Sequence, residues 1–166
     1  MDAPERRELR DELLGILSGR GAHMTLEEAA ADFPPEAVAR RPPNVDYTPW
    51  QLLEHIRLTQ ADILDYVRDS AAYAGRRWPE EYWPAPEDLG TPEAFAATVA
   101  GYRADREALR AIVRDRAADP LAVLPNTPGH TIMRECRVVA DHDAYHIGEF
   151  AILRQVMGTW PPDRGR

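Results

Sequence analysis

Two histidines near the C-terminal end of the chain, His142 and His146, have the residue type and spacing of a metal-binding pair. They are four residues apart in a segment with helical periodicity, so we expect them on one helix face with Cβ atoms about 5–6 Å apart. Two imidazoles in that arrangement can bind a single ion, at roughly 2.0–2.1 Å for each Zn–N bond. A third ligand has to come from another part of the chain.

The chain contains three further histidines that can supply this ligand. His23 lies in a glycine-bounded loop, where we expect exposure to solvent, and His130 lies about 18 Å along the expected helix from His142. Both are interpreted as structural. His55 lies at the edge of the apolar arc of another expected helix, where it can face the pair, which makes it the best candidate. Histidines at such positions also serve as packing residues, and the spacing alone does not separate the two roles.

Other chemically active side chains lie close to the pair in sequence. Cys136 is about 120° around the expected helix and two turns away, which excludes it from the same ion. Glu149 points nearly the same way as the pair and is either a direct ligand or an acceptor that orients an imidazole. Tyr145 is a weaker candidate for proton transfer. Asp141 and Asp143 point about 100° away, and we expect them to contact solvent or to support the ligands from outside.

The elements that would position these residues are helices. Amphipathic segments with Leu, Ile and Val at helical spacing are separated by stretches rich in glycine and proline, and no strand pattern is convincing. Thr-Pro pairs begin two of these segments and a Thr-x-x-Glu capping box begins a short one. The expected helices cover about residues 5–17, 25–32, 49–67, 92–112 and 131–157. We predict an all-α, four-helix bundle with long connections, as a single domain over residues 1–166, with the topology left open.

The connection between the second and third long helices contains an aromatic segment, with Trp78, Tyr82 and Trp83 among several prolines. Structured loops of this kind often line a site. The same side chains can instead cover the end of a helical bundle. The sequence is compatible with both interpretations.

Charge and composition restrict the partners and the compartment. A formal net charge of −8 disfavours binding to nucleic acid or to an anionic membrane. The single cysteine cannot form an internal disulfide, which favours a reducing compartment. The charged N-terminus lacks the apolar segment of a signal peptide, and no apolar run approaches the ~20 residues of a membrane span. We therefore expect a cytoplasmic protein without nucleic-acid or membrane partners.

Three segments resemble the DinB-like family of metalloenzymes: residues 47–56 (YTPWQLLEHI), 129–131 (GHT) and 140–149 (ADHDAYHIGE). The resemblance implies a four-helix bundle, often a homodimer, that holds a divalent metal on three histidines. By position these histidines map to His55, His142 and His146. Some relatives are S-transferases, and one is a maleylpyruvate isomerase; these enzymes use low-molecular-weight thiols.

Three neutral imidazoles leave coordination positions for water or substrate, which is typical of a catalytic site. Our leading hypothesis is a metal-dependent transferase or hydrolase that activates a nucleophile, in the first instance a thiol cosubstrate, against a small molecule. Zn or Ni is favoured, with Fe or Mn as alternatives, and Glu149 and Tyr145 are the candidate catalytic residues. The alternative is a non-catalytic bundle that binds a metal or ligand for sensing or interaction.

Overall fold

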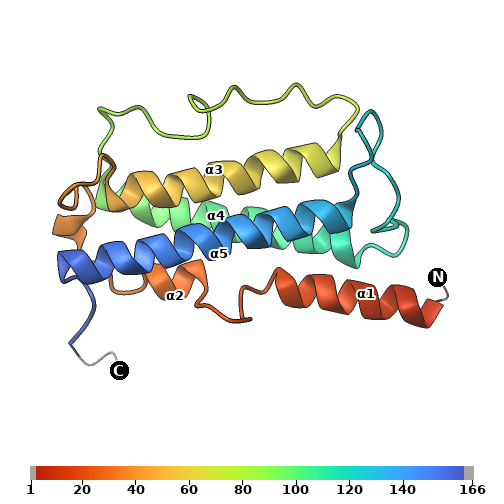
Figure 1. Ribbon diagram of the computed structural model, residues 1–166, viewed down its shortest axis with the longest axis horizontal. Helices are drawn as coiled ribbons and strands as arrows, with labels where there is room; N and C mark the ends of the chain where they lie inside the picture. The colour runs from red at the N-terminus through yellow and green to blue at the C-terminus, as the bar shows by residue number, and fades with distance from the viewer. Residues whose placement is uncertain (1–2, 163–166) are drawn as a thin grey trace.

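The computed structural model describes residues 3–162, which form an all-α fold. Four long helices pack as a bundle with long connections, as the sequence predicts (Figure 1). The elements in chain order are α1 (Ala3–Ile16), α2 (Leu26–Ala30), a short 3-10 helix (Pro35–Ala37), α3 (Pro49–Arg68), α4 (Pro92–Arg114) and α5 (Ile132–Met157).

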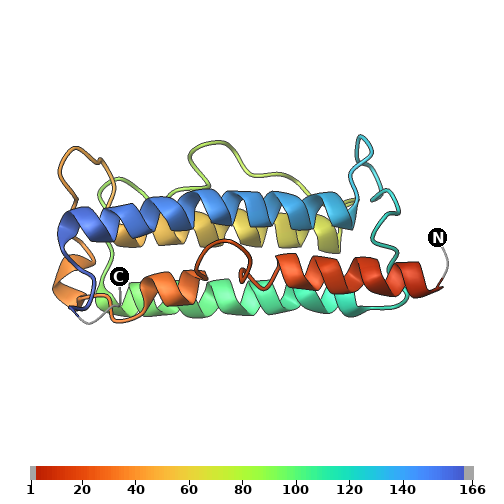
Figure 2. The same ribbon diagram turned by 60° about the horizontal axis from the view of Figure 1, so that its bottom comes forward.

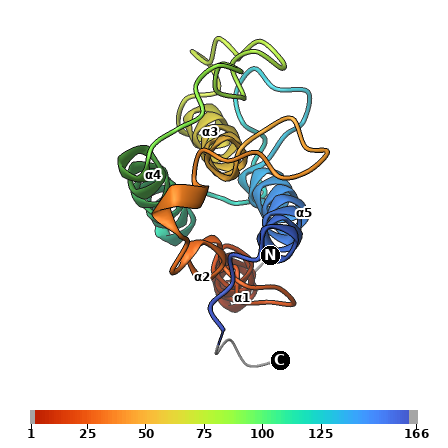
Figure 3. The ribbon, with the colours of Figure 1, turned by 90° about the vertical axis from the view of Figure 1, so that its left-hand side faces the viewer.

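The four edges of the bundle are α3, α4, α5 and a composite of α1 and α2, which follow one another along the same edge (Figures 1 and 2). Helix α3 packs against both α4 and α5, and α1 packs against the same two helices from the opposite side. The view along the axis places α1 diagonally opposite α3 (Figure 3). Helices α3 and α5, which carry the three histidines of interest, are therefore direct neighbours.

The topology that the sequence left open is visible in the course of the chain. Helices α3 and α4 run in the same direction, and α1 and α5 run in the opposite one (Figure 1). Residues 69–91 return along the length of the bundle, outside α3, before α4 begins. This return is the structural reason for the length of that connection, because two parallel helices cannot be joined by a short turn.

The predicted helix starts are confirmed at the level of single hydrogen bonds. Thr48 caps α3: its hydroxyl accepts from the Gln51 backbone N–H, and the Gln51 side chain accepts from the Thr48 N–H at 2.8 Å. Thr91 and Thr131 cap α4 and α5 through the same hydroxyl contact. Such a cap satisfies a backbone donor at the first turn and is worth about 1 kcal/mol. The Thr48 cap also fixes the start of the helix that presents His55.

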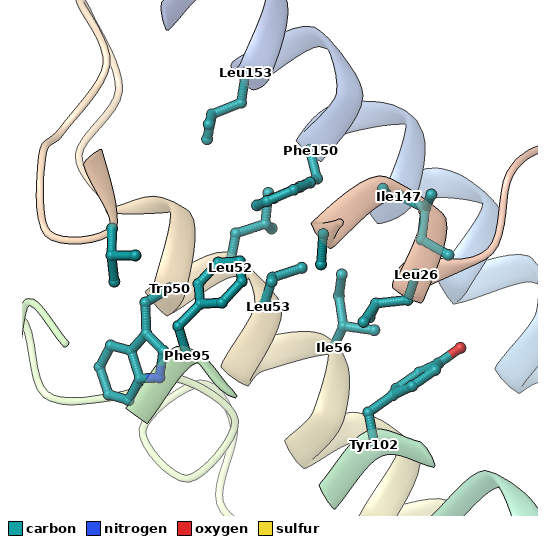
Figure 4. Close-up of a cluster of buried hydrophobic side chains, with 13 residues drawn as sticks. Leu26, Trp50, Leu52, Leu53, Ile56, Phe95, Tyr102, Ile147, Phe150 and Leu153 are labelled. Atoms are coloured by element: carbon teal, nitrogen blue, oxygen red, sulfur yellow. The ribbon is translucent and has the colours of Figure 1, made fainter. Parts of the chain in front are cut away.

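Apolar side chains form two buried clusters, one in each half of the bundle. The first joins α2 to the beginnings of α3 and α4 and the end of α5 (Figure 4). The second joins α1 to the other halves of the three long helices. These faces follow from the 3.6-residue period of each helix, and their burial supplies the main driving force for packing.

A buried polar layer separates the two clusters. Gln60, Arg106 and Asp143 each lie on a long helix between residues of the first cluster and residues of the second. The Arg106 guanidinium donates to the Asp143 carboxylate and to Gln60 Oε1, and the Tyr102 hydroxyl donates to Asp143 at 2.6 Å. The expectation for Asp143 was therefore wrong. Its side chain neither contacts solvent nor supports the histidines, because that face of α5 points into the bundle.

Among the described residues, no helix is both long enough and apolar enough to cross a lipid bilayer. The surface of the long helices remains heavily charged, in keeping with the composition.

Candidate metal centre

The imidazoles of His55, His142 and His146 meet between α3 and α5. His55 Nε2 lies 3.3 Å from His146 Nε2 and 3.2 Å from His142 Nε2. The ligand atoms of all three residues lie within 4.8 Å of one another. The three residues that the sequence singled out therefore form one cluster, with His55 fully buried and the other two half-buried.

The spacing of the nitrogen atoms fits a divalent ion. In a tetrahedral site with bonds of 2.0–2.1 Å, neighbouring ligand nitrogens lie roughly 3.3–3.4 Å apart. The two measured Nε2–Nε2 distances of 3.2 and 3.3 Å are close to this value. The donor set is thus suited in size and chemistry to hold one metal ion.

The hydrogen bonds at the far side of two rings determine which nitrogen carries the proton. His55 Nδ1 lies 2.7 Å from the backbone carbonyl of Tyr82, which can only accept, so Nδ1 is the protonated nitrogen. His146 Nδ1 lies 2.6 Å from a Glu149 carboxylate oxygen, which has the same effect. In the neutral rings both Nε2 atoms then carry lone pairs. These lone pairs approach each other to 3.3 Å, a repulsive arrangement that a cation placed between them would relieve.

The local electrostatics favour the neutral form of two of the imidazoles, those of His142 and His55. Burial, together with the neighbouring His146 and His55, lowers the pKa of His142 to about 3. Burial also lowers the pKa of His55, although its hydrogen bond to the Tyr82 carbonyl opposes this effect. Neutral imidazole is the form that binds a metal, so His55 and His142 need no deprotonation at neutral pH before they can act as ligands.

The aromatic connection covers the outer side of this cluster and does not close the end of the bundle. The Trp83 ring stacks on the His55 imidazole, with centroids 4.0 Å apart and planes 4° from parallel. Tyr82 supplies the carbonyl that binds His55 Nδ1. Of the two roles that the sequence allowed for this segment, the one beside the site agrees with the contacts.

Two exposed aromatic rings flank the cluster. Trp78 is 68% exposed, and its ring meets the His55 ring edge-on at 6.4 Å. Tyr145 is 73% exposed and meets the His146 ring edge-on at 4.8 Å. The two rings place exposed apolar surface directly beside the histidines.

The remaining sequence candidates lie outside the cluster. His130 Nδ1 lies 2.9 Å from the Tyr66 hydroxyl, in agreement with a structural role. Cys136 is fully buried in the second apolar cluster, and burial raises the pKa of its thiol to about 12. Asp141 is exposed, as expected. His23 was expected to be exposed, and this was wrong: its ring is half-buried because Nδ1 bonds the Met24 carbonyl at 2.7 Å.

Glu149 belongs to the surroundings of the cluster, with each carboxylate oxygen engaged. One oxygen bonds His146 Nδ1, and the other accepts a hydrogen bond from the Tyr47 hydroxyl. The sequence indicated the position of Glu149 from its helical direction. It assigned no role to Tyr47, which directly precedes the Thr-Pro start of α3 and begins the segment 47–56 that carries the family resemblance.

A four-helix bundle with a three-histidine cluster that can hold a metal ion is the class of protein defined by this fold and site. The family model of the DinB superfamily matches residues 20–150, and the chain belongs to this superfamily. The matched range contains all three histidines. Searches of curated proteins and of solved structures found no match to the chain.

Proposed function

We propose that this protein is a metal-dependent enzyme that activates a nucleophile, in the first instance a thiol, for attack on a small molecule. The observation that carries the proposal is the convergence of three imidazoles on one point, with two Nε2–Nε2 distances that suit a single ion. A purely packing role would favour hydrogen bonds between the rings. With Nδ1 protonated on both residues, the neutral rings of His55 and His146 have no proton left for such a bond to each other.

His55, His142 and His146 would hold the ion, with zinc or nickel favoured and iron or manganese as alternatives for this nitrogen-based ligand set. When bound, a divalent ion supplies positive charge that lowers the pKa of a coordinated water or thiol. The choice between a transferase and a hydrolase therefore depends on which nucleophile reaches the open positions.

The chain's own groups have separate tasks around that ion. Glu149 and the Tyr82 carbonyl orient two of the imidazoles, and Trp83 covers His55 and keeps water from its outer face. Tyr145 contacts His146 from the exposed side, where its side chain is open to a substrate and to solvent. Tyr145 is therefore assigned to the substrate side of the site, and Glu149 to the protein side.

The substrate proposal is a small electrophile with an apolar or aromatic part. In thiol transfer, the sulfur forms a bond to the electrophilic carbon, the leaving group departs with its electron pair, and the thiol proton is released to solvent. The exposed rings of Trp78 and Tyr145 offer apolar surface next to the histidines for such a molecule. The net charge of −8 argues against nucleic acid as a partner. A homodimer is proposed from the family resemblance alone.

The test compares metal content and turnover in matched proteins. Wild type purified under mild conditions should contain a divalent metal, the triple variant His55→Ala/His142→Ala/His146→Ala should not, and the control His130→Ala should retain it. Metal-loaded wild type should also accelerate conjugation of small thiols to a haloarene. Unchanged metal content in the triple variant would refute the metal assignment. Metal binding without turnover for several thiols and metals would favour a binding protein over an enzyme.

A further inference from the structure

Tyr47 contacts two residues that touch the histidine cluster, Glu149 and Trp83, although it lies on neither of the helices that carry the histidines. Its hydroxyl donates a hydrogen bond to one oxygen of Glu149, whose other oxygen bonds His146 Nδ1 at 2.6 Å. Its ring packs against the Trp83 ring at 5.4 Å, and Trp83 stacks on His55. Two chains of contacts from one residue therefore end on two of the three imidazoles.

We propose that Tyr47 is a positioning residue of the metal centre, which holds Glu149 in place so that His146 keeps its Nε2 lone pair directed at the ion. This inference rests on the proposed function and adds to it a residue that acts through Glu149. Tyr47 itself does not touch the imidazoles that would bind the metal.

The Glu149 side chain needs such support because it is 32% exposed and has several rotatable bonds. Without the Tyr47 hydroxyl, the carboxylate is free to turn toward water and to release His146 Nδ1. The imidazole could then exchange its proton between the two nitrogens, and the form with Nε2 protonated cannot bind a metal through that atom. Outer contacts of this kind typically change metal affinity by about 10–100-fold.

The position of Tyr47 is itself well determined. It directly precedes Thr48, which is fully buried and caps α3 through the reciprocal bonds with Gln51. Burial and the Glu149 carboxylate raise the pKa of Tyr47 well above its usual value, so its hydroxyl remains a donor at all ordinary pH values. A fixed donor opposite a mobile acceptor is the arrangement expected of a residue that orients its neighbour.

The test is Tyr47→Phe, which removes the hydroxyl and keeps the ring against Trp83. Nitrogen-15 NMR of the metal-free protein should show His146 protonated at Nδ1 in wild type and a mixture of both tautomers in the variant. The tautomer of His55 should be unchanged, because the Tyr82 carbonyl still accepts the hydrogen bond from its Nδ1. Zinc affinity should fall about 10–100-fold. Tyr66→Phe is the matched control, since the hydroxyl it removes bonds His130, which lies outside the cluster. It should change neither the His146 tautomer nor the zinc affinity.

A double-mutant cycle with Glu149→Ala separates positioning from a general loss of structure. If Tyr47 acts through Glu149, then Tyr47→Phe should have little further effect on zinc affinity once Glu149 is alanine. Additive effects would overturn the inference, as would a Tyr47→Phe protein with the same His146 tautomer and zinc affinity as Tyr66→Phe. If wild type binds no metal, the proposed function fails, but the NMR comparison still tests the role of Tyr47.

Discussion

The buried ion pair between Arg106 and Asp143 allows a quantitative prediction for the substitution Asp143→Ala. The two side chains are only 10% and 4% exposed. Removing one partner of a buried pair typically costs about 3–5 kcal/mol, because the remaining charge stays buried without its counterion. The lower end applies here, since Arg106 keeps its bonds to Gln60 and to the Leu17 carbonyl. Against a typical unfolding free energy of about 5–15 kcal/mol, a loss of this size is large.

The measurement is urea unfolding of the metal-free protein, supported by thermal melts. A loss of about 3 kcal/mol corresponds to a decrease in Tm of roughly 6–12 °C for a chain of this size. Asp141→Ala, at an exposed position two residues away, is the control and should change stability by less than about 0.5 kcal/mol. The double variant Arg106→Met/Asp143→Leu should recover most of the loss, because an apolar pair leaves no charge unpaired. A loss below about 1 kcal/mol in Asp143→Ala would refute this account of the polar layer.

Three further predictions concern the cluster and the core. The first concerns His142, whose pKa is about 3 in the folded protein and about 6.5 in the unfolded chain. The unfolded chain therefore binds the proton first, so the urea midpoint of the metal-free protein should decrease as the pH is lowered from about 6.5 to about 3. A midpoint that does not change over this pH range would contradict the prediction. Cys136 should resist iodoacetamide in the native state and react in urea, and native labelling would show that it is accessible. Wild type with cobalt bound should react faster with benzyl mercaptan than with ethanethiol, because the exposed Trp78 ring lies beside the site. The variant Trp78→Ala should keep its cobalt but react with the two thiols at similar rates. An unchanged rate preference would exclude Trp78 from the substrate site.

The helices and their starts could be predicted because they depend on local interactions. Thr48 and Thr91 cap helices through contacts with residues three positions away, and Pro at the next position suits the first turn. The histidine pair was predictable for the same reason, since a spacing of four residues sets two side chains on one face. His55 could be placed on the correct side of its helix from the angle it makes with the apolar residues.

The contacts that complete the site could not be predicted because they join distant parts of the chain. Tyr47 and Glu149 are 102 residues apart, and nothing in either local sequence indicates the other. For Asp143, the helical angle gave its direction relative to the histidines but not which side of α5 faces the interior. Asp141 and Asp143 are both offset by about 100° from His142, and only the packing of α5 decides that Asp143 is buried and Asp141 exposed.

The long return of residues 69–91 along α3 means that the histidines and the cover over them come from different parts of the chain. The helices carry the three histidines of the candidate site, whereas this connection supplies the cover over His55 and the ring of Trp78 beside the site. Insertions or replacements around Trp78 can therefore reshape what the centre admits while the bundle and its ligands stay intact. Exchange of this one surface segment would change what reaches the histidine cluster without redesign of the helical core.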